Sequence, residues 1–305
     1  MDTPHAIEMR SLTRHFGEQV AVDALTIDIE AGELFGVVGP DGAGKTTTLR
    51  MLAGVLRPTD GTAIVAGVDV ATDPEKVKPH IAYMSQRFGM YEDLTVKENL
   101  DFYADLYRVP KAERPERLKR LYDFSRLGEF TDRLAGNLSG GMKQKLSLSC
   151  ALIHKPDILL LDEPTFGVDP ISRRELWLIL HEMVAEGITI VVSTSYLDEA
   201  ERCDRVALLN EGRLLALDAP AALQTSLPGR MLAIEAVEPR PARDVLRQAA
   251  FVQSAYLFGD VIHVLVDAGT SDDDALAPLR SAGLAVREHG ETAASLEDVF
   301  MGLVA

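Results

Sequence analysis

Two short stretches of this sequence carry residue types suited to binding a phosphate chain and a metal ion. The first, GPDGAGKTT, fits the pattern G-x-x-x-x-G-K-[ST] and lies between an apolar run, LFGVV, and a helical pattern. A phosphate-binding loop needs that order of strand, loop and helix, because glycines let successive backbone N–H groups turn toward phosphate oxygens. In such a loop Lys45 reaches the β and γ phosphate oxygens, and the Thr46 hydroxyl ligates Mg²⁺. The predicted nucleotide-binding residues here are Gly39, Asp41, Gly42, Ala43, Gly44, Lys45, Thr46 and Thr47.

The second stretch, ILLLDEPT, ends an apolar run with two adjacent carboxylates, Asp162 and Glu163. In an open α/β sheet, ligands bind beyond the carboxyl ends of the strands, and this run delivers its acids there. Asp162 would hold Mg²⁺ through water. Glu163 would orient or polarise the attacking water, since phosphoryl transfer depends on an in-line nucleophile and charge neutralisation. On its own such a pair is mostly structural, and the phosphate-binding loop upstream favours the catalytic interpretation.

The pattern of the chain predicts a sheet and helices that can position these residues. Short strand-like runs alternate with longer helical patterns, and the runs Ile158–Leu161 and Ile188–Val192 are apolar throughout. Such runs are typical of a parallel sheet that helices cover on both faces. The region from Met1 to about Gln224 is therefore predicted to be an α/β domain of the P-loop type.

Two further segments differ from this α/β region. From about residue 87 to residue 138, helical periods with many charges predict a helical insertion, and its basic block RPERLKR is most simply a solvated helix face. After the turn SLPGR, the order strand, helix, strand, strand, helix, strand predicts a small ferredoxin-like α+β module. We therefore expect an α/β domain over residues 1–226 and an accessory or regulatory module over residues 227–305.

The composition excludes several classes of function. The formal net charge of −16 argues against a general nucleic-acid binder, which needs a basic face to neutralise phosphates, although a local basic patch is compatible with it. Cys150 and Cys203 are far apart and indicate neither a disulfide framework nor a zinc site, which fits a reducing cytosol. The first residues lack the basic-then-apolar order of a signal peptide, and no apolar run approaches the ~20 residues of a membrane helix. A membrane role would therefore need another chain to span the bilayer.

A third stretch, LSGGMKQKLSLSCAL, lies between the loop and ILLLDEPT. In sequence and in order it resembles the signature of the nucleotide-binding subunits of ABC transporters. The resemblance implies ATP as the nucleotide, Mg²⁺ as the metal, and a second ATPase subunit, identical or different, that clamps two ATP molecules head to tail with this one. Ser139, Gly140 and Gly141 would then contact the γ-phosphate of ATP held by the partner, because a hydroxyl, glycine N–H groups and a helix start form an anion site.

Three more positions match this family one by one. Phe16, in LTRHFGEQVAVD, falls where family members stack an aromatic ring on adenine, the alternative being a core phenylalanine. Gln86, in YMSQRFGMYEDLTVKENL, matches the glutamine that contacts Mg²⁺ and the water and links to the helical insertion. Asp169, in FGVDP, matches the aspartate that communicates across the dimer. The resemblance covers Glu8 to about Gln224, and the ending SLEDVFMGL with the extra module indicates the drug-exporter branch, of the DrrA type.

Ser195, in VVSTSYLDEAE, departs from the family pattern, which has a histidine in contact with the γ-phosphate at this place. Serine is shorter, carries no positive charge and offers one hydroxyl instead of an imidazole. The site is therefore expected to bind ATP well and to turn it over poorly. GPDGAGKTT together with STSYLDEAE also resembles the first ATPase half of tandem exporters of the YbhF type, whose second half carries the histidine. The alternative is that Tyr196 or a water replaces the imidazole, with Glu163 retained.

The family resemblance implies an ATP-hydrolysing motor subunit of a membrane exporter. It would energise a separate transmembrane permease from the cytoplasmic, inner face of the cell membrane. ATP binding would close the dimer and move the helical insertion against the permease, and hydrolysis would reopen it. Two alternatives are a soluble ABC-family ATPase acting on ribosomes or DNA, and a nucleotide-gated scaffold that does not hydrolyse its ATP.

Overall fold

The computed structural model describes residues 5–86 and 89–304, and the chain divides into two units, Met1–Leu217 and Asp218–Ala305. The division falls a few residues before the predicted one between residues 226 and 227. The helix α8 (Pro220–Thr225) packs against α11 (Leu296–Val304), and the two helices lie in the same unit. The segment that the sequence placed at the end of the first domain therefore belongs to the second unit.

A six-stranded sheet forms the centre of the first unit. Its order is β10-β9-β3-β8-β7-β6, and the pairings of β3 with β8 and β9, of β7 with β8 and of β6 with β7 are parallel. Every residue of β3, β7 and β8 is buried, as expected of strands covered on both faces, and the predicted parallel sheet is confirmed. The strands are β3 (Leu34–Val38), β6 (Ile81–Met84), β7 (Ile158–Asp162), β8 (Thr189–Thr194), β9 (Arg205–Asn210) and β10 (Arg213–Asp218).

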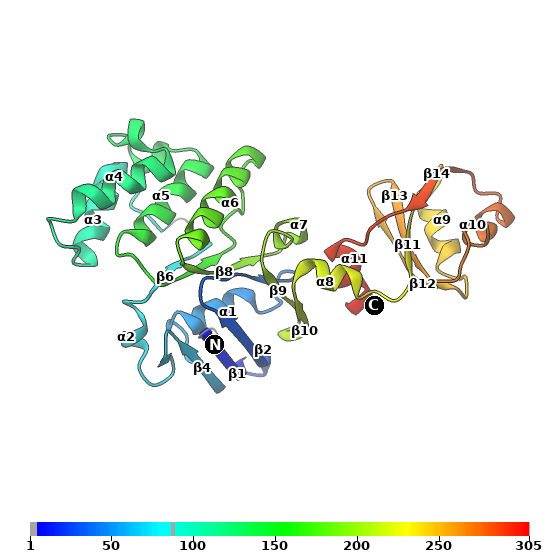
Figure 1. The fold of residues 1–305 in the computed structure, drawn as a ribbon, viewed down its shortest axis with the longest axis horizontal. Coiled ribbons are helices and arrows are strands. Elements are labelled where there is room, and N and C mark those ends of the chain that lie inside the picture. Colours follow the sequence, from blue (N-terminus) through cyan, green and yellow to red (C-terminus); the bar gives the residue numbers. More distant parts are fainter. Residues whose placement is uncertain (1–4, 87–88, 305) are drawn as a thin grey trace. The chain divides into compact units, whose positions relative to one another are not determined.

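Helices cover the two faces of this sheet, as Figure 1 shows. On one face α1 packs against β7 and β8, and on the other α5 and α6 pack against β6 and β8. Because the strands are parallel, their carboxyl ends lie at one edge, and the loops that follow β3, β6, β7 and β8 meet there. Helices α1 (Lys45–Leu52), α6 (Pro170–Ala185) and α7 (Leu197–Ala200) follow strands β3, β7 and β8 of this sheet, and the short helix α2 (Pro74–Val77) precedes β6.

A second, antiparallel sheet with the order β2-β1-β4-β5 packs on the α1 side of the core. The separate sheet was not predicted from the sequence. Ile7 and Met9 of β1 and Ile27 of β2 join the apolar cluster that contains Leu49 of α1. The strands are β1 (His5–Phe16), β2 (Gln19–Glu30), β4 (Asp60–Val65) and β5 (Val68–Asp69).

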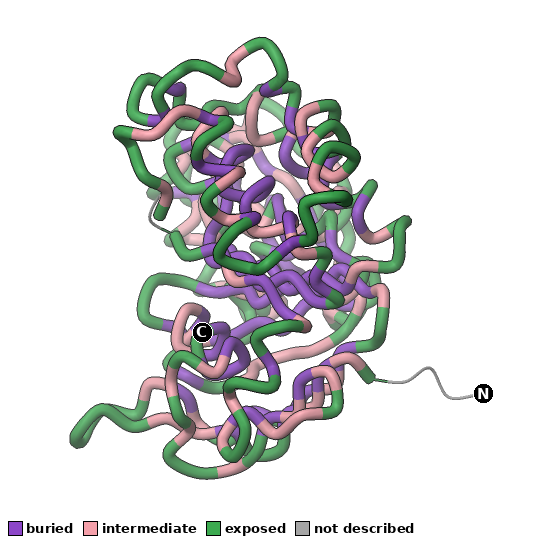
Figure 2. The backbone as a smooth tube through the Cα atoms, turned by 90° about the vertical axis from the view of Figure 1, so that its left-hand side faces the viewer, coloured by how far each residue is buried: buried purple, intermediate pink, exposed green. Residues whose placement is uncertain are grey.

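The helical insertion has an apolar core of its own, which includes Val96, Leu100 and Leu121. Its first helix begins at a capping box, in which Thr95 and Glu98 each accept a hydrogen bond from the other's backbone N–H. The predicted start at residue 87 lies outside the described residues. Figure 2 shows the buried residues gathered inside the fold and the exposed ones along its loops. The helices are α3 (Val96–Leu106), α4 (Arg114–Ser125), η1 (Gly128–Phe130), η2 (Ala135–Asn137) and α5 (Gly140–Leu152).

The second unit contains a four-stranded sheet with the order β12-β13-β11-β14, in which every pairing is antiparallel. Two helices, α9 and α10, contribute Leu246 and Leu279 to its core. The element order is strand, helix, strand, strand, helix, strand, and the flanking helices α8 and α11 are additional to that expectation. The elements are β11 (Arg230–Ala236), α9 (Pro239–Leu246), β12 (Val252–Phe258), β13 (Val261–Val266), α10 (Asp272–Ser281) and β14 (Val286–Glu291).

Candidate nucleotide site

The loop between β3 and α1 is held tightly between neighbouring strands. A Cβ atom on Gly39 would lie 2.2 Å from the carbonyl oxygen of Leu209 in β9. Gly44 has φ +99° and lies so close to β2 that a Cβ atom there would be 2.5 Å from the carbonyl oxygen of Ala21. Only glycine fits both positions, and the backbone then leads directly into the first turn of α1, whose N–H groups have no intrahelical partner. This is a cradle for an anion, and it fits a phosphate group.

Lys45, the first residue of α1, turns back over this loop. Its side chain is 5% exposed, and Nζ donates hydrogen bonds to the carbonyl oxygens of Gly39 (2.8 Å) and Pro40 (3.1 Å). It also forms an ion pair with Oε1 of Glu163 at 3.2 Å. A buried ammonium group needs such partners, because desolvation without them is costly. An anion that enters the loop therefore meets a positive charge already in place.

The Asp162 carboxylate accepts hydrogen bonds from three side-chain hydroxyl groups. The hydroxyl groups of Thr46 and Ser193 each donate to Oδ1 at 2.8 Å, and the Tyr83 hydroxyl donates to Oδ2 at 3.2 Å. Burial and the charge of Asp162 together raise the pKa of Tyr83, which stays a neutral donor. The oxygens of Thr46 and Asp162 are the hard ligands that Mg²⁺ prefers, so the residues present fit that ion.

The Glu163 carboxylate is held through both of its oxygens. Lys45 pairs with Oε1, and the amide of Gln86 donates to Oε2 at 2.8 Å. The backbone N–H of Glu163 donates to the Ser193 hydroxyl at 3.0 Å, and the residue has φ +48°. The side chain is thereby directed across the end of the sheet toward the loop. The structure thus brings together three residues that were selected from the sequence, Gln86, Lys45 and Glu163.

Ser195 follows the last residue of β8, and no residue in the described ranges forms a hydrogen bond with its side chain. Its two neighbours in the sequence, Thr194 and Tyr196, both contact other residues. The Thr194 hydroxyl donates to the buried Glu199 carboxylate at 2.9 Å and accepts the N–H of Tyr196 at 3.0 Å. The guanidinium group of Arg173, from α6, lies over the Tyr196 ring at 4.5 Å from its centroid. One face of the Tyr196 ring is therefore covered by an arginine of α6.

A cavity of about 300 Å³ opens in front of the loop. Phe16 stands at its wall with 47% of its surface exposed, and the Arg14 guanidinium lies over the ring at 4.6 Å. Phe16 is therefore not a core phenylalanine, and an apolar ring system could lie beside it. The cavity is lined by Phe16, Gln19, Ala21, Asp41, Gly42, Ala43, Gly44, Lys45, Thr46, Thr47, Gln86 and Glu163.

The other predicted contacts, Ser139, Gly140, Gly141 and Asp169, do not line this cavity. Ser139 is the N-cap of α5 and accepts the N–H of Met142 at 3.3 Å. Asp169 is the N-cap of α6 and accepts the N–H groups of Ser172 and Ile171, hydrogen bonds that lower the pKa of Asp169. A single chain does not bring these residues into the cavity at the loop.

Known proteins similar to this chain are ATP-binding proteins, which agrees with the geometry of the nucleotide cavity. A family model described as ABC transporter matches residues 22–166. The daunorubicin/doxorubicin resistance ATP-binding protein DrrA of Streptomyces peucetius is 36% identical over 303 residues, which cover 98% of this chain and 92% of DrrA. The chain belongs to the ABC transporter family of ATP-binding proteins. The probable multidrug ABC transporter ATP-binding protein YbhF of Escherichia coli (strain K12) is 45% identical over 305 residues, 98% of this chain and 52% of YbhF. This ABC chain therefore spans about half the length of YbhF.

Solved structures agree with the family assignment. The dimeric, post-hydrolysis ATP-binding cassette MJ0796 bound to ADP and Pi superimposes with a TM-score of 0.63 at 25% identity, covering 70% of this chain and 98% of that chain. The predicted α/β fold of the P-loop type is thereby confirmed as that of an ABC cassette. Within the part of the chain that the structure describes, no helix is both long enough and apolar enough to cross a membrane.

Two of the hydrogen-bond donors to Asp162, Tyr83 and Ser193, were not predicted from the sequence. Both stand at or next to the carboxyl end of an apolar strand, β6 or β8, where a polar side chain reaches the ligand edge of the sheet. The rule that selected Asp162 applies to them as well. Gln19 and Ala21 of β2, which line the cavity, have no such signal because their position depends on the packing of the second sheet.

Proposed function

We propose that this ABC chain is an ATP-binding and ATP-hydrolysing subunit of a membrane exporter, and that it energises a separate permease at the inner face of the membrane. The observation that carries the proposal is the set of contacts Gln86–Glu163–Lys45 across the mouth of the loop, beside the Thr46–Asp162 pair. The names of YbhF and DrrA, a multidrug transporter component and a drug-resistance protein, support an exporter.

The residues of the loop would bind ATP and hold its triphosphate. Lys45 exchanges the carbonyl oxygens of Gly39 and Pro40 for phosphate oxygens, while the start of α1 donates N–H groups. Thr46 and Asp162 would hold Mg²⁺, with Gln86 nearby. When bound, that ion neutralises charge on the β and γ phosphates.

Glu163 would orient the attacking water. Once Lys45 turns to phosphate, Oε1 of Glu163 is free to accept a hydrogen bond from water, while Gln86 holds Oε2. Positioning the nucleophile in line with the phosphate is the main task of the protein in this reaction. Phe16, exposed at the cavity wall, would stack on adenine.

Ser195 would make this chain's own site slow. Its hydroxyl replaces the imidazole of the family pattern, and the arginine that covers Tyr196 supports the view that this neighbour does not take over the role. Removing one transition-state contact typically costs about 2.7–4 kcal/mol. A partner subunit with the histidine would then supply the fast site, completed by Ser139, Gly140 and Gly141 of this chain.

ATP hydrolysis by the purified chain tests this function. Lys45→Ala should weaken ATP binding at least tenfold, about 1.4 kcal/mol, because the preformed charge in the loop is lost. Glu163→Gln should keep ATP affinity and lower turnover by about 10²–10³, since the amide cannot act as the base. Steady-state phosphate release and equilibrium binding of a fluorescent ATP analogue measure the two effects separately. Unchanged affinity in Lys45→Ala, or undiminished turnover in Glu163→Gln, would refute the assignment.

A further inference from the structure

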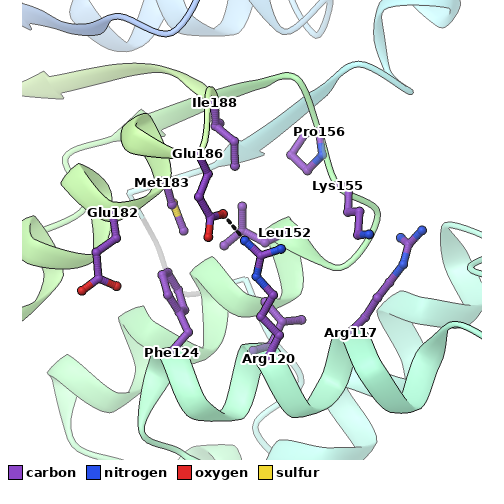
Figure 3. Close-up of a pocket in the computed structure, with 11 residues that line it drawn as sticks. Arg117, Arg120, Phe124, Leu152, Lys155, Pro156, Glu182, Met183, Glu186 and Ile188 are labelled. Atoms are coloured by element: carbon purple, nitrogen blue, oxygen red, sulfur yellow. Dashed lines mark hydrogen bonds and ion pairs between the residues drawn. The ribbon is translucent and has the colours of Figure 1, made fainter.

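A second cavity, of about 250 Å³, lies between the helical insertion and the α/β core (Figure 3). Its walls come from α4, the end of α5 and the turn after it, the end of α6, and the segment before β8. These segments precede β7 and β8, whereas the nucleotide cavity lies beyond the carboxyl ends of those strands. The two cavities share no lining residue and belong to opposite edges of the sheet.

The floor of this cavity is apolar. Leu121 and Met183 are buried, and Leu152 and Phe124 are partly covered beside them. Figure 3 shows Phe124, Leu152 and Met183 around one hollow that α4 and α6 enclose. A concave apolar floor with a few polar groups at its rim is the usual form of a small-molecule site.

One side of the rim carries basic residues and the other side carries an acidic residue. Arg120 of α4 pairs with Glu186 at the end of α6, so that their charges compensate each other. Figure 3 places Arg117 and Lys155 on one side and Glu182 on the other. An anionic group would therefore be attracted to the side that carries Arg117 and Lys155.

The two cations on that side differ in their surroundings. The Arg117 guanidinium donates to the carbonyl oxygen of Ile153 at 2.8 Å and pairs with Glu113, yet its Nε is buried and has no hydrogen-bond partner within the described ranges. Lys155 is exposed, and it forms no ion pair with any carboxylate that the structure describes. Its φ of +59° places it in the turn after α5, next to the segment that Arg117 contacts. The ammonium group of Lys155 is therefore the cation at this rim that can meet the acid group of a ligand.

We infer that this cavity binds a small amphipathic anion, such as an aryl or short alkyl carboxylate. Its apolar body lies on Leu121, Leu152 and Met183, and its acid group lies against the ammonium group of Lys155. Because the walls belong to both the helical insertion and the core, the bound anion stabilises one arrangement of these two parts.

Binding of 1-naphthoate to the full chain, measured by its fluorescence and by calorimetry, tests this site. The wild type should bind 1-naphthoate about tenfold more tightly than the neutral 1-naphthalenemethanol, since hydrogen bonds to charged groups are the stronger ones. Lys155→Met should remove that preference while keeping the aliphatic stem. Lys119→Met is the matched control, because Lys119 lies on α4 with its side chain 81% exposed and pairs with Asp123.

Filling the cavity gives a second test that does not depend on charge. Leu152→Trp should reduce the affinity for both compounds at least tenfold, because the ring occupies the apolar floor. If that variant does not fold, Phe124→Ala, at a partly exposed position, should weaken both compounds severalfold instead. The proposal is overturned if 1-naphthoate does not bind saturably, if the alcohol binds equally well, or if Lys155→Met and the cavity variants leave its affinity unchanged.

Discussion

Ser195 stands where the family resemblance implies a histidine, and its replacement tests that expectation directly. Ser195→His should raise the turnover of ATP at least tenfold, about 1.4 kcal/mol of barrier, because an imidazole restores a contact to the transferred phosphate. Steady-state hydrolysis at equal protein concentrations measures the effect, with Glu163→Gln as the blank.

Tyr196 provides the control for that experiment. Tyr196→Phe keeps the ring under Arg173 and removes only the hydroxyl, so turnover should stay at the level of the wild type. If wild type already hydrolyses ATP rapidly, histidine adds nothing and Tyr196→Phe is slow, then the tyrosine has replaced the imidazole and the chain can work without a faster partner.

At the scale of elements, the starts of α5 and α6 touch at Gly141. A Cβ atom on Gly141 would lie 2.3 Å from Cβ of Ser172, a contact that no rotamer of Ser172 can relieve because Cβ does not move with χ1. Gly141→Ala should therefore cost about 1–3 kcal/mol of unfolding free energy, as overpacked contacts do. Urea unfolding followed by the fluorescence of Trp177, the single tryptophan and a buried residue of α6, reports on this unit.

Gly140 is the matched control, since an added Cβ there would lie 3.5 Å from the nearest atom, the carbonyl oxygen of Gly167. Gly140→Ala should be neutral or stabilising by up to about 1 kcal/mol, because alanine favours a helix over glycine. Equal stability of the two variants would show that α5 moves aside without cost and that the close approach does not require glycine.

A buried carboxylate, that of Asp298, stabilises the start of the helix α11. Asp298 accepts hydrogen bonds from the N–H (2.8 Å) and hydroxyl (2.7 Å) of Ser295, and His263 of β13 lies 3.0 Å from the same oxygen. Burial opposes the ionisation of Asp298, but these hydrogen bonds outweigh it and lower the pKa of the carboxyl below its ordinary value of 3.8. The ionised form therefore stabilises the second unit.

The lowered pKa of Asp298 makes the stability of the second unit depend on pH. A lowered pKa in the folded state gives a stabilisation that is complete above the ordinary carboxyl pKa and is lost as the pH falls through the lowered value. Asp298→Asn should cost about 1 kcal/mol or more at pH 7, and the difference from wild type should shrink below about pH 4. Calorimetry of the full chain measures it, and Asp273→Asn, at an 85% exposed side chain of α10, should show no such trend.

At the scale of the whole molecule, the proposed function requires two chains. Ser139, Gly140, Gly141 and Asp169 lie outside the nucleotide cavity of their own chain, so a second subunit would have to bring its copies of them to the loop. Glu163→Gln should therefore accumulate as a dimer at saturating Mg-ATP, because binding closes the pair and hydrolysis cannot reopen it. Light scattering after size exclusion measures the mass.

The double variant Lys45→Ala, Glu163→Gln is the control, since it lacks the ammonium that holds the phosphates and should stay monomeric. A monomer of Glu163→Gln at saturating Mg-ATP would contradict the head-to-tail arrangement for this chain with itself. A dimer of the double variant would show that the chains associate through another surface.

Features that depend on neighbours along the chain could be predicted from the sequence. The loop from Gly39 to Thr47 was predictable because strand, glycines, lysine and helix follow one another directly. Asp162 and Glu163 were predictable because an apolar strand ends at them. The helix α11 could have been found in the same way, since Ser295 and Asp298 stand at the spacing of a capping box before an apolar run.

Which distant residues meet depends on how the whole chain packs. Thr46 and Asp162 are 116 positions apart, and Tyr83 and Ser193 reach the same carboxylate because β6, β7 and β8 lie side by side in the sheet. The strand order results from the burial of many apolar side chains together, a property that no short stretch contains. The same holds for the second cavity, whose apolar floor and unequal rim arise where α4 of the insertion packs beside α6 of the core.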